Sequence, residues 1–507
     1  MTRFNRRIFV FGTAAAAGAL ALGGSASAAI AFPFTLGVAS GDPLPDGVVL
    51  WTRLAPAPLN ADGHGGMPNS PMTVYWQVAT DQGFTQIVRS GEVAAQYADA
   101  HSVHVEVDGL QPDAEYYYRF RADGHLSPVG RTRTAPAFDV LGRNFLMAFT
   151  SCAHYESGYY TVYRRMADDR PDLILHLGDY IYEDAATSGS VREHLGSEIV
   201  SLADYRRRYA QYKADTDLQA AHAAAPWLVV PDDHEVENNY ANLTRADNSP
   251  ALTAAQFKQR RADAYKAYYE NMPLRATAKP TGADIPLYRR VRWGQLATFH
   301  MLDTRQYRND QACDDGWKYC PSAGDPARSL PGMTQENWLL NGLSQHTGTW
   351  DVIGQQVFFA RNADGDDAVS MDAWDGYPAS RDRIQKGWVQ RGVRNPVVLT
   401  GDVHRAWAND LKVDYTNPGA PVIGTELVTS SVSSGGDGAD TTGIPNGAYN
   451  PHLRFYSQHR GYVRAQVTPA AMNVDFRAVD KITTRGAAAR TLKSFVIQEG
   501  RPGLQNP

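Results

Sequence analysis

The chain has only three cysteines, no strong excess of charge of either sign, and no long apolar run beyond its N-terminal segment. Its 49 basic and 54 acidic side chains are interspersed, with a formal net charge of −5. A nucleic-acid-binding partner is not expected, because such proteins need a clustered basic surface. No transmembrane anchor is expected, because no later apolar run is long enough to span a bilayer. A chain of 507 residues allows two or three domains, and we expect a monomer that acts on small or surface-presented molecules.

The N-terminus has the pattern of an export signal. Arg6 and Arg7 precede an alanine-rich apolar run, and the tripeptide ASA at positions 26–28 provides a cleavage site. Adjacent arginines are typical of the twin-arginine (Tat) route, whose signal is an address read by the Tat export machinery. The alternative, an N-terminal membrane helix, needs a longer and less Ala/Gly-rich segment. We therefore predict that residues 1–28 are a signal peptide and that the mature protein is secreted.

The cysteines fall into a pair and a single residue. Cys313 and Cys320 enclose the short polar loop CDDGWKYC and are close enough in sequence to form a local disulfide in an oxidising compartment. Cys152 is left alone. A lone cysteine in an exported protein is either an inert buried residue or a thiolate with a chemical task, and both interpretations stay open here.

Residues 33–137 contain short β-rich runs separated by turns. A spacing of about 8 to 12 residues with alternating hydrophobicity predicts a small antiparallel, immunoglobulin-like β-sandwich. Within it, the stretch GLQPDAEYYYRF is similar to the corner between strands E and F of immunoglobulin-like and fibronectin type III domains. In that comparison Pro112 turns the chain, and Tyr116 or Tyr118 packs back against it.

From Phe145 onward, strand-like apolar runs alternate with amphipathic helical patterns. This alternation indicates an α/β layer arrangement over residues 143–480, followed by a C-terminal segment, residues 481–507. The Gly- and Ser-rich loop at residues 432–443 is expected to be mobile. The run of three arginines at positions 206–208 falls on a predicted helix, where successive side chains point in different directions, so a solvated face is expected.

Polar groups follow five of the predicted strands in the α/β region. They are Cys152, Asp179 with Tyr182, the run Asp232-Asp233-His234-Glu235, Gln355 with Gln356, and Asp402 with His404. A single strand-end Asp is usually a helix N-cap or a turn residue, but five such caps do not explain a thiol, a phenol and two histidines together. Ligands in α/β sheets collect at the carboxyl ends of strands. A carboxylate there costs several kcal/mol unless it is compensated, so a cation is expected beside Asp179.

These motifs carry a resemblance to a known family. GDYIYE, DDHEVENN and GDVHR, with SC after a strand and GVASGDPLPDGVVLWTRL near the start of the mature chain, resemble the PhoD-type alkaline phosphatase and phosphodiesterase family. That family is a branch of the calcineurin-like metallophosphatases. The resemblance extends over essentially the whole chain. It implies a mixed α/β (α+β) fold in which an αββα metallophosphoesterase sandwich follows the N-terminal β-sandwich, and two metal sites bridged by one Asp.

The resemblance assigns the first metal site to Tyr182 and His404, with Asp179 as the bridge and Cys152 where a carboxylate is expected. Thiolate, phenolate, imidazole and a bridging carboxylate suit Fe³⁺, because anionic ligands neutralise its charge and the set is partly soft. A phenolate bound to ferric iron should give the pure protein a visible colour.

The second metal site departs from the superfamily pattern. DDHE replaces GNHE, so Asp233 offers oxygen, and GDVH replaces GHxH, so Asp402 offers oxygen where an imidazole is expected. Amides from Asn238, Gln355 or Gln356 would complete the set. Such ligands suit a hard, flexible cation, best Ca²⁺, as one or two ions. The resemblance implies the same iron and calcium pairing, and zinc or manganese is left open.

Three further side chains are candidates for catalysis. His234, beside Asp233, is the best proton donor to a leaving alkoxide, although it could instead only orient that carboxylate. Arg405 and Arg305 each follow a predicted strand and could bind a phosphate oxygen. Each could equally form a salt bridge at the sheet edge.

The first functional hypothesis is a secreted metal-dependent phosphoesterase that hydrolyses phosphodiesters and also phosphomonoesters. Its substrate could be a small diester, a polymer or a phospholipid. Phospholipase D-type cleavage of phospholipid headgroups, an activity known within the family that the chain resembles, would run through the same metal site, because the HKD motifs of the usual phospholipases D are absent. The alternative from another class is a non-catalytic cell-surface binding protein on a residual metal scaffold.

Overall fold

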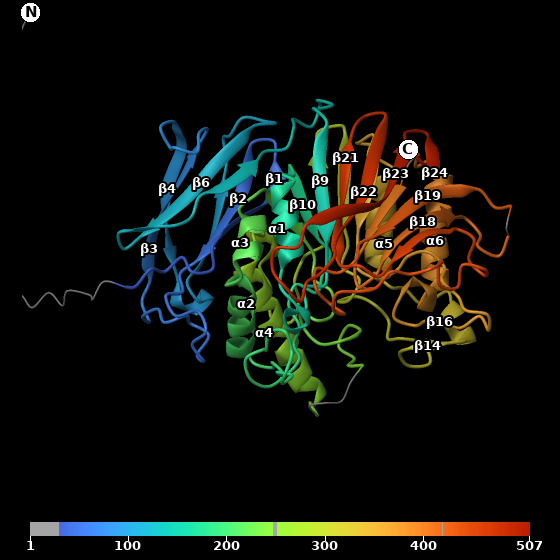
Figure 1. Cartoon of the computed structure of the whole chain (residues 1–507), viewed down its shortest axis with the longest axis horizontal. Helices are drawn as coiled ribbons and strands as arrows, with labels where there is room; N and C mark the ends of the chain where they lie inside the picture. Colours follow the sequence, from blue (N-terminus) through green and yellow to red (C-terminus); the bar gives the residue numbers. More distant parts are fainter. Residues whose placement is uncertain (1–29, 247–250, 395, 418) are drawn as a thin grey trace, which may run out of the picture.

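The structure is a computed structural model that describes residues 30–246, 251–394, 396–417 and 419–507 (Figure 1). The predicted signal peptide, residues 1–28, lies outside this part of the chain. Within the described ranges, no helix combines the length and the apolar character that crossing a membrane requires.

Two large sheets form the centre of the molecule. One has ten strands in the order β24-β23-β22-β21-β9-β10-β11-β1-β2-β5, and the other has seven in the order β12-β13-β15-β17-β19-β18-β20. The strands of the ten-stranded sheet are β1 (Val38–Leu44), β2 (Gly47–Arg53), β5 (Ser102–Val107), β9 (Phe145–Thr150), β10 (Leu173–His176), β11 (Pro226–Val229), β21 (Gly461–Val467), β22 (Ala471–Val479), β23 (Ala489–Gln498) and β24 (Arg501–Gln505). The strands of the seven-stranded sheet are β12 (Arg289–Trp293), β13 (Ala297–Met301), β15 (Trp350–Gly354), β17 (Pro396–Thr400), β18 (Ala406–Lys412), β19 (Val422–Val428) and β20 (Leu453–Ser457).

Helices cover the outer faces of both sheets. They are α1 (Thr161–Asp168), α2 (Leu202–Lys213), α3 (Thr216–His222), α4 (Ala254–Asn271), α5 (Met333–Leu343) and α6 (Pro378–Gln390). The first four contribute side chains to one core with the ten-stranded sheet. The last two share a different core with the seven-stranded sheet.

Alternate side chains of the central strands enter different cores, as the two-residue period of a strand requires. On β10, Ile174 packs with Tyr163 of α1. Its neighbours Leu173 and Leu175 face the other way and pack with Phe299 between the two sheets. The layers are therefore helices, sheet, sheet and helices, and the predicted αββα arrangement is confirmed.

The N-terminal antiparallel sheet lies at one end of the molecule (Figure 1). Its strands are β3 (Met72–Ala79), β4 (Ile87–Ala95), β6 (Glu115–Ala122), β7 (His125–Leu126) and β8 (Gly130–Arg133). Its inner face shares a core with β2 and β5, so the sandwich expected from the sequence is present. The Tyr116 hydroxyl accepts a hydrogen bond from the Gln111 amide at 2.9 Å, which is the predicted tyrosine contact at the corner.

The expected domain boundaries do not separate independent sheets. β1 pairs in parallel with β11, with Ser40 opposite Pro226, so the second sheet of the N-terminal sandwich continues into the α/β region. At the other end, β23 and β24 extend the same sheet beyond β22, so residues 481–507 are not a separate segment. Composition marks where strands begin and end, but it carries no sign of which distant strand a given strand will join.

The predicted disulfide between Cys313 and Cys320 is present. It closes the loop that carries β14 (Trp317–Lys318), which pairs with β16 (Val369–Ser370) in a small separate antiparallel sheet. The short 3₁₀ helices are η1 (Tyr97–Asp99), η2 (Tyr155–Ser157), η3 (Ala276–Ala278), η4 (Pro321–Gly324) and η5 (Trp374–Gly376).

Candidate metal centre

The candidate ligands follow the carboxyl ends of strands in both sheets. β9, β10 and β11 are parallel neighbours in one sheet, and β17 lies in the other. The residues that follow these four strands are Cys152, Asp179, Asp232, Asp233, Asp402 and His404. The two sheets meet at this edge, because Ser151, just after β9, forms a β-bridge with Ser431, just after β19. One site can therefore draw ligands from both sheets.

Four of the predicted ligands have an unusual backbone conformation. φ is +59° at Cys152, +54° at Asp179, +61° at Asp402 and +57° at His404. Residues with a side chain rarely adopt this left-handed region, and each instance costs on the order of 1 kcal/mol. Strain of this kind gathers at active sites and ligand clamps. Its presence at four predicted ligands supports a functional role for this edge of the sheets.

The first ligand group combines sulfur, oxygen and nitrogen. Cys152, Asp179 and His404 have ligand atoms that all lie within 4.8 Å of one another. The Tyr182 hydroxyl lies 3.0 Å from His404 Nε2 and 3.2 Å from Asp179 Oδ2. Burial, and then the charge of Asp179, raises the pKa of both the Cys152 thiol and the Tyr182 phenol. Both groups therefore keep their protons unless a cation compensates the negative charge.

The second group contains only carboxylates. Asp179, Asp232, Asp233 and Asp402 have oxygens within 4.8 Å of one another. One oxygen of each of Asp179, Asp232 and Asp233 is buried and has no hydrogen-bond partner within the described residues. Burial raises the pKa of Asp402 to about 7, and burial together with Asp233 raises that of Asp179. Buried oxygens without partners are costly, so this donor set fits a cation that shares Asp179 with the first group.

Arg305 lies beside the second group and is almost fully buried, with 1% of its surface exposed. Its Nε is 2.5 Å from Asp232, its Nη2 is 3.3 Å from Asp233, and its Nη1 is 2.8 Å from Asp372. Binding of a substrate phosphate by Arg305 stays a prediction, because these ion pairs occupy Nε and Nη1 but leave Nη2 without a hydrogen-bond partner within the described residues. The alternative prediction for Arg305, a salt bridge, is confirmed, but the salt bridge is buried. Asp232 and Asp233 lie on one side of the guanidinium group and Asp372 on the other.

His234 contacts both ligand groups. Its Nδ1 is 2.7 Å from Glu183 Oε2, and its ring centroid is 4.1 Å from that of Tyr182. Its Nε2 lies 4.0 Å from Asp233 Oδ2, which is too long for a hydrogen bond. Burial opposes its protonation, but Glu183 and Asp233 outweigh burial and raise the pKa of His234 above its usual value. The raised pKa favours the protonated imidazole, which has an N–H at both Nδ1 and Nε2.

Two of the three amides expected at the second site are engaged in other contacts. Gln355 accepts a hydrogen bond from Trp374 Nε1 at 3.0 Å, and Gln356 accepts one from the Thr304 amide at 3.2 Å. Both glutamines are fully buried in these contacts, so their prediction as metal ligands is wrong. Asn238 is exposed on the loop after Asp233, and its role as a metal ligand stays a prediction. A polar residue at a strand end can brace a loop as readily as it binds a cation, and its type does not distinguish the two.

Ser434 is a site residue that the sequence did not reveal. Its hydroxyl lies 2.7 Å from the Tyr182 hydroxyl and donates to the Cys152 carbonyl at 2.9 Å. The prediction of a mobile loop at residues 432–443 is wrong for the start of this stretch, because Ser433 and Ser434 are both buried. Serine-rich composition is the same in a mobile loop and in a buried hydrogen-bonded brace, so no sequence signal marks the difference.

Arg208 is a second residue whose role was not predicted. It is buried and donates hydrogen bonds to the backbone carbonyls of Tyr182 and Asp184. Arg206 is buried as well and binds Glu270 through two bonds of 2.7 and 2.6 Å. The solvated face expected for this arginine run is therefore wrong at two of its three positions. Arg208 instead fixes the backbone of the loop that carries Tyr182.

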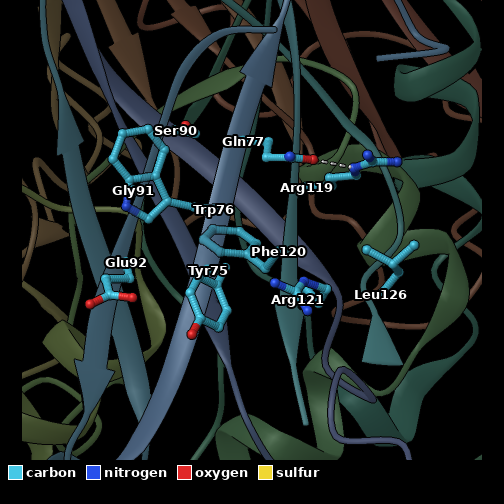
Figure 2. Close-up of a pocket in the computed structure, with 10 residues that line it drawn as sticks. All are labelled: Tyr75, Trp76, Gln77, Ser90, Gly91, Glu92, Arg119, Phe120, Arg121 and Leu126. Atoms are coloured by element: carbon cyan, nitrogen blue, oxygen red, sulfur yellow. Dashed lines mark hydrogen bonds between the residues drawn. The ribbon is translucent and has the colours of Figure 1, made fainter. Parts of the chain in front are cut away.

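A groove of about 500 Å³ lies on the N-terminal five-stranded sheet, away from the sheet edge that carries the ligands (Figure 2). Arg121 stacks over the ring of Tyr75, and Arg119 donates to the Gln77 side chain at 2.9 Å. None of its lining residues belongs to either ligand group.

Two family models match the chain. The PhoD-like phosphatase model matches residues 147–476, and the model of the PhoD-like phosphatase N-terminal domain matches residues 18–136. The chain belongs to the PhoD-like phosphatase family. Alkaline phosphatase D of Bacillus subtilis (strain 168) is 48% identical to this PhoD-like phosphatase over 526 residues, which covers 99% of this chain and 89% of that protein.

Solved structures agree with this assignment. A structure described as that of PhoD matches with a TM-score of 0.90 at 49% identity and covers 94% of this chain and 92% of its own. The purple acid phosphatase PPD1 of yellow lupin has a TM-score of 0.55 at 12% identity, covering 93% of this chain and 74% of its own, which shows a likeness of fold alone. This PhoD-like phosphatase is a hydrolase of phosphoester bonds, and the hypothesis of a non-catalytic binding protein is set aside.

Proposed function

We propose that this PhoD-like phosphatase is a secreted, metal-dependent enzyme that hydrolyses phosphodiesters and also accepts phosphomonoesters. Phosphoester hydrolysis itself follows from its family. The preference for diesters, the identity of the metals and secretion are the proposed parts. The observation that carries the proposal is the pair of adjoining ligand groups that share Asp179.

The donor chemistry supports Fe³⁺ in the first group and Ca²⁺, as one or two ions, in the second. A thiolate, a phenolate, an imidazole and a carboxylate suit ferric iron, and Cys152, Asp179, Tyr182 and His404 would hold it. Carboxylate oxygens suit calcium, and the residues that would hold it are Asp179, Asp232, Asp233 and Asp402. When bound, these cations would supply Lewis-acid activation and charge stabilisation at phosphorus.

His234 is the proposed general acid. Because Glu183 binds its Nδ1, the proton on Nε2 is free to pass to the alkoxide oxygen that leaves phosphorus. The contact of its ring with Tyr182 fixes the direction of that N–H. A role confined to orienting Asp233 would need a hydrogen bond between the two side chains, and the separation of 4.0 Å does not provide one.

Metal analysis of the protein as isolated, together with its visible spectrum, tests this proposal. We expect iron and calcium, and a visible absorption band that Tyr182→Phe abolishes. Tyr180→Phe is the matched control, because that neighbouring hydroxyl bonds His222 instead, at 2.8 Å, and the band should remain. A colourless protein without iron would overturn the metal assignment. A coloured protein that cleaves no phosphodiester would overturn the substrate class.

Phospholipase D-type cleavage is the second candidate for the same centre. Trp317 and Tyr319, on the disulfide-closed loop, are 52% and 69% exposed. Asp315 ties this loop to Asn239, just after the ligand loop, through a bond of 2.6 Å. Exposed Trp and Tyr side chains are suited to a lipid interface. Release of choline from phosphatidylcholine, compared with release of p-nitrophenol from bis(p-nitrophenyl) phosphate, separates the two activities.

The support for secretion is the N-terminal pattern of residues 1–28. Export of the full chain should fail when Arg6 and Arg7 are both replaced by lysine, and fractionation of culture medium and cells would measure it. Unchanged secretion of that double variant would contradict the twin-arginine route.

A further inference from the structure

Two arginines meet beside the first ligand group. The carbonyl oxygen of His404 accepts a hydrogen bond from Arg405 Nη1 at 2.8 Å and another from Arg460 Nη1 at 2.7 Å. The same two guanidinium groups flank Gly435, where an added Cβ would lie 3.3 Å from Arg460 Nη1 and 3.5 Å from Arg405 Nη1. Two positive charges thus share a small region next to a candidate metal ligand.

Across the described parts of the chain, neither guanidinium forms an ion pair with a carboxylate. Arg460 has no exposed surface, its other bonds go to neutral oxygens such as Ser431 Oγ at 2.8 Å, and its Nε has no partner there. Burial, and then the charge of Arg405, lowers the pKa of Arg460 to about 10. Asp437, two residues beyond Gly435, is engaged by the backbone amides of Ile482 and Thr483. Uncompensated buried charge of this kind is costly, and an anion would relieve it.

The pair opens to solvent on one side. Gly435 is exposed and Arg405 is only half-buried. The next residue, Gly436, has no described atom within 4 Å of its Cβ position. φ is +87° at Gly435 and +73° at Gly436, a conformation that favours glycine and so keeps this entrance free of side chains. An anion that enters here would meet Arg405 first, with the charge of Arg460 behind it.

We propose that Arg405 and Arg460 form a subsite for a second anionic group of the substrate, a phosphate close to the scissile phosphodiester. This inference rests on the proposed function and narrows its substrate class. Arg405 binds the second phosphate directly, and Arg460 is a positioning residue that adds charge behind it. The second phosphate could belong to a phosphorylated small alcohol or to the neighbouring unit of a phosphodiester polymer, and both share the same chemistry at the subsite.

The experiment compares two chromogenic diesters with wild-type and variant enzyme. The substrates are thymidine 5′-(p-nitrophenyl phosphate) with and without a phosphate on its 3′ oxygen, and an oligomer of glycerol phosphate is the third. Arg405→Gln should raise KM for the 3′-phosphorylated diester about tenfold, as expected for the loss of a charged hydrogen bond, and change KM for the plain diester much less. Arg460→Lys should act in the same direction. If Arg460→Lys does not fold, Arg405→Gln alone decides.

Arg490→Gln is the matched control. Arg490 is exposed and paired with Asp480 at 2.8 Å, so its replacement changes the net charge equally but should leave all three KM values unaltered. If Arg405→Gln raises KM selectively for the 3′-phosphorylated diester, the subsite binds a phosphorylated alcohol. If it raises KM for the oligomer alone, the subsite binds the neighbouring unit of a polymer. An equal effect of Arg405→Gln on all three substrates would overturn the subsite. Wild-type enzyme that cleaves none of them would instead overturn the proposed function.

Discussion

Ser434 has one hydroxyl proton and two acceptors for it. With a neutral Tyr182, Ser434 donates to the Cys152 carbonyl, and the phenol proton has two acceptors within reach, Asp179 Oδ2 at 3.2 Å and Ser434 Oγ at 2.7 Å. Once Tyr182 is deprotonated, the serine proton becomes the natural partner of the phenolate oxygen. A hydrogen bond to a phenolate lowers the energy of its electrons, so its loss should lower the energy of charge transfer to iron.

If the first ligand group holds the proposed ferric iron, Ser434→Ala should retain it and shift the visible band to longer wavelength. Ser433→Ala is the control, since that hydroxyl donates to the His154 carbonyl at 2.7 Å instead. Absorption spectra and iron analysis of both variants measure the effect. A band that stays in place in Ser434→Ala, or moves equally in both variants, would contradict this role.

Arg305 acts as a counter-ion to the second ligand group. Removing one partner of a buried charge network costs about 3–5 kcal/mol, so Arg305→Met should destabilise the metal-free protein by roughly that amount. Ca²⁺ should restore part of the loss, because the cation replaces the missing positive charge beside Asp232 and Asp233. Urea unfolding with chelator and with calcium measures both effects.

Arg490→Met provides the comparison for that measurement, because an exposed ion pair contributes about 1 kcal/mol or less. The same loss of stability for Arg305→Met with and without calcium would show that the cation and the guanidinium do not share a site.

At this scale, the sequence revealed the residues whose types are rare at strand ends. Cys152, Tyr182 and His404 could be recognised because thiols, phenols and imidazoles have few other reasons to follow an apolar strand. Gln355 and Ser434 could not be placed, because amides and hydroxyls bind backbone as often as they bind anything else. Left-handed backbone at non-glycine residues has no sequence signature.

Helix α2 ends in a buried lysine. Lys213 lies 4.0 Å from the ring of Trp51 and 3.4 Å from His222 Nε2, and burial lowers its pKa well below the usual value. Between the lowered pKa of Lys213 in the folded protein and about pH 10, the unfolded chain binds a proton that the folded chain does not, so this group makes stability rise with pH across that window.

Lys213→Met should therefore be more stable than the parent at pH 7, and its advantage should shrink as the pH approaches about 10. Urea unfolding across this pH range measures the difference. An advantage that does not change with pH would show that Lys213 keeps its charge in the folded protein.

Strand β1 leaves no room for a side chain at Gly41. A Cβ there would lie 2.4 Å from the Pro273 carbonyl oxygen and 2.9 Å from that of Trp227 on β11. Gly41→Ala should destabilise the protein by about 1–3 kcal/mol, the usual cost of overpacking. Gly324→Ala, where no described atom lies within 4 Å, is the control in thermal unfolding. Equal melting temperatures for the two variants would contradict the close approach of β1 and β11.

The sequence predicted most strands and helices, but not how distant strands pair. Alternation of apolar residues reports which face of a strand is buried, and the run SVHVEV of β5 was recognisable for that reason. The partner of β1 is β11, far along the chain, and both faces of such a strand are buried whichever neighbour it has. Pairing depends on the packing of the whole molecule.

For the whole molecule, the shared sheet predicts that the α/β region depends on the N-terminal segment. A chain that begins at residue 138 would lack β1, β2 and β5 and would expose the edge of β11. Open edges of this kind favour aggregation. We expect that fragment to be insoluble under conditions that keep residues 30–507 in solution, as measured by sedimentation after expression. A soluble fragment with native circular dichroism would show that the sheet tolerates a free edge there.

Two contacts near the site join residues that are far apart in the chain. They are the bridge between Ser151 and Ser431 and the pairing of Phe149 on β9 with Val463 on β21. They determine when the site can assemble during synthesis of the protein. The ribosome releases Cys152 and Asp179 long before His404 and Ser434 exist, so a nascent chain lacks the complete ligand set during most of its synthesis. Contacts of such long range form slowly. The long-range half of the ligand set therefore assembles late, and a chain that has not yet joined β9 to β21 leaves strand edges open to misfolding.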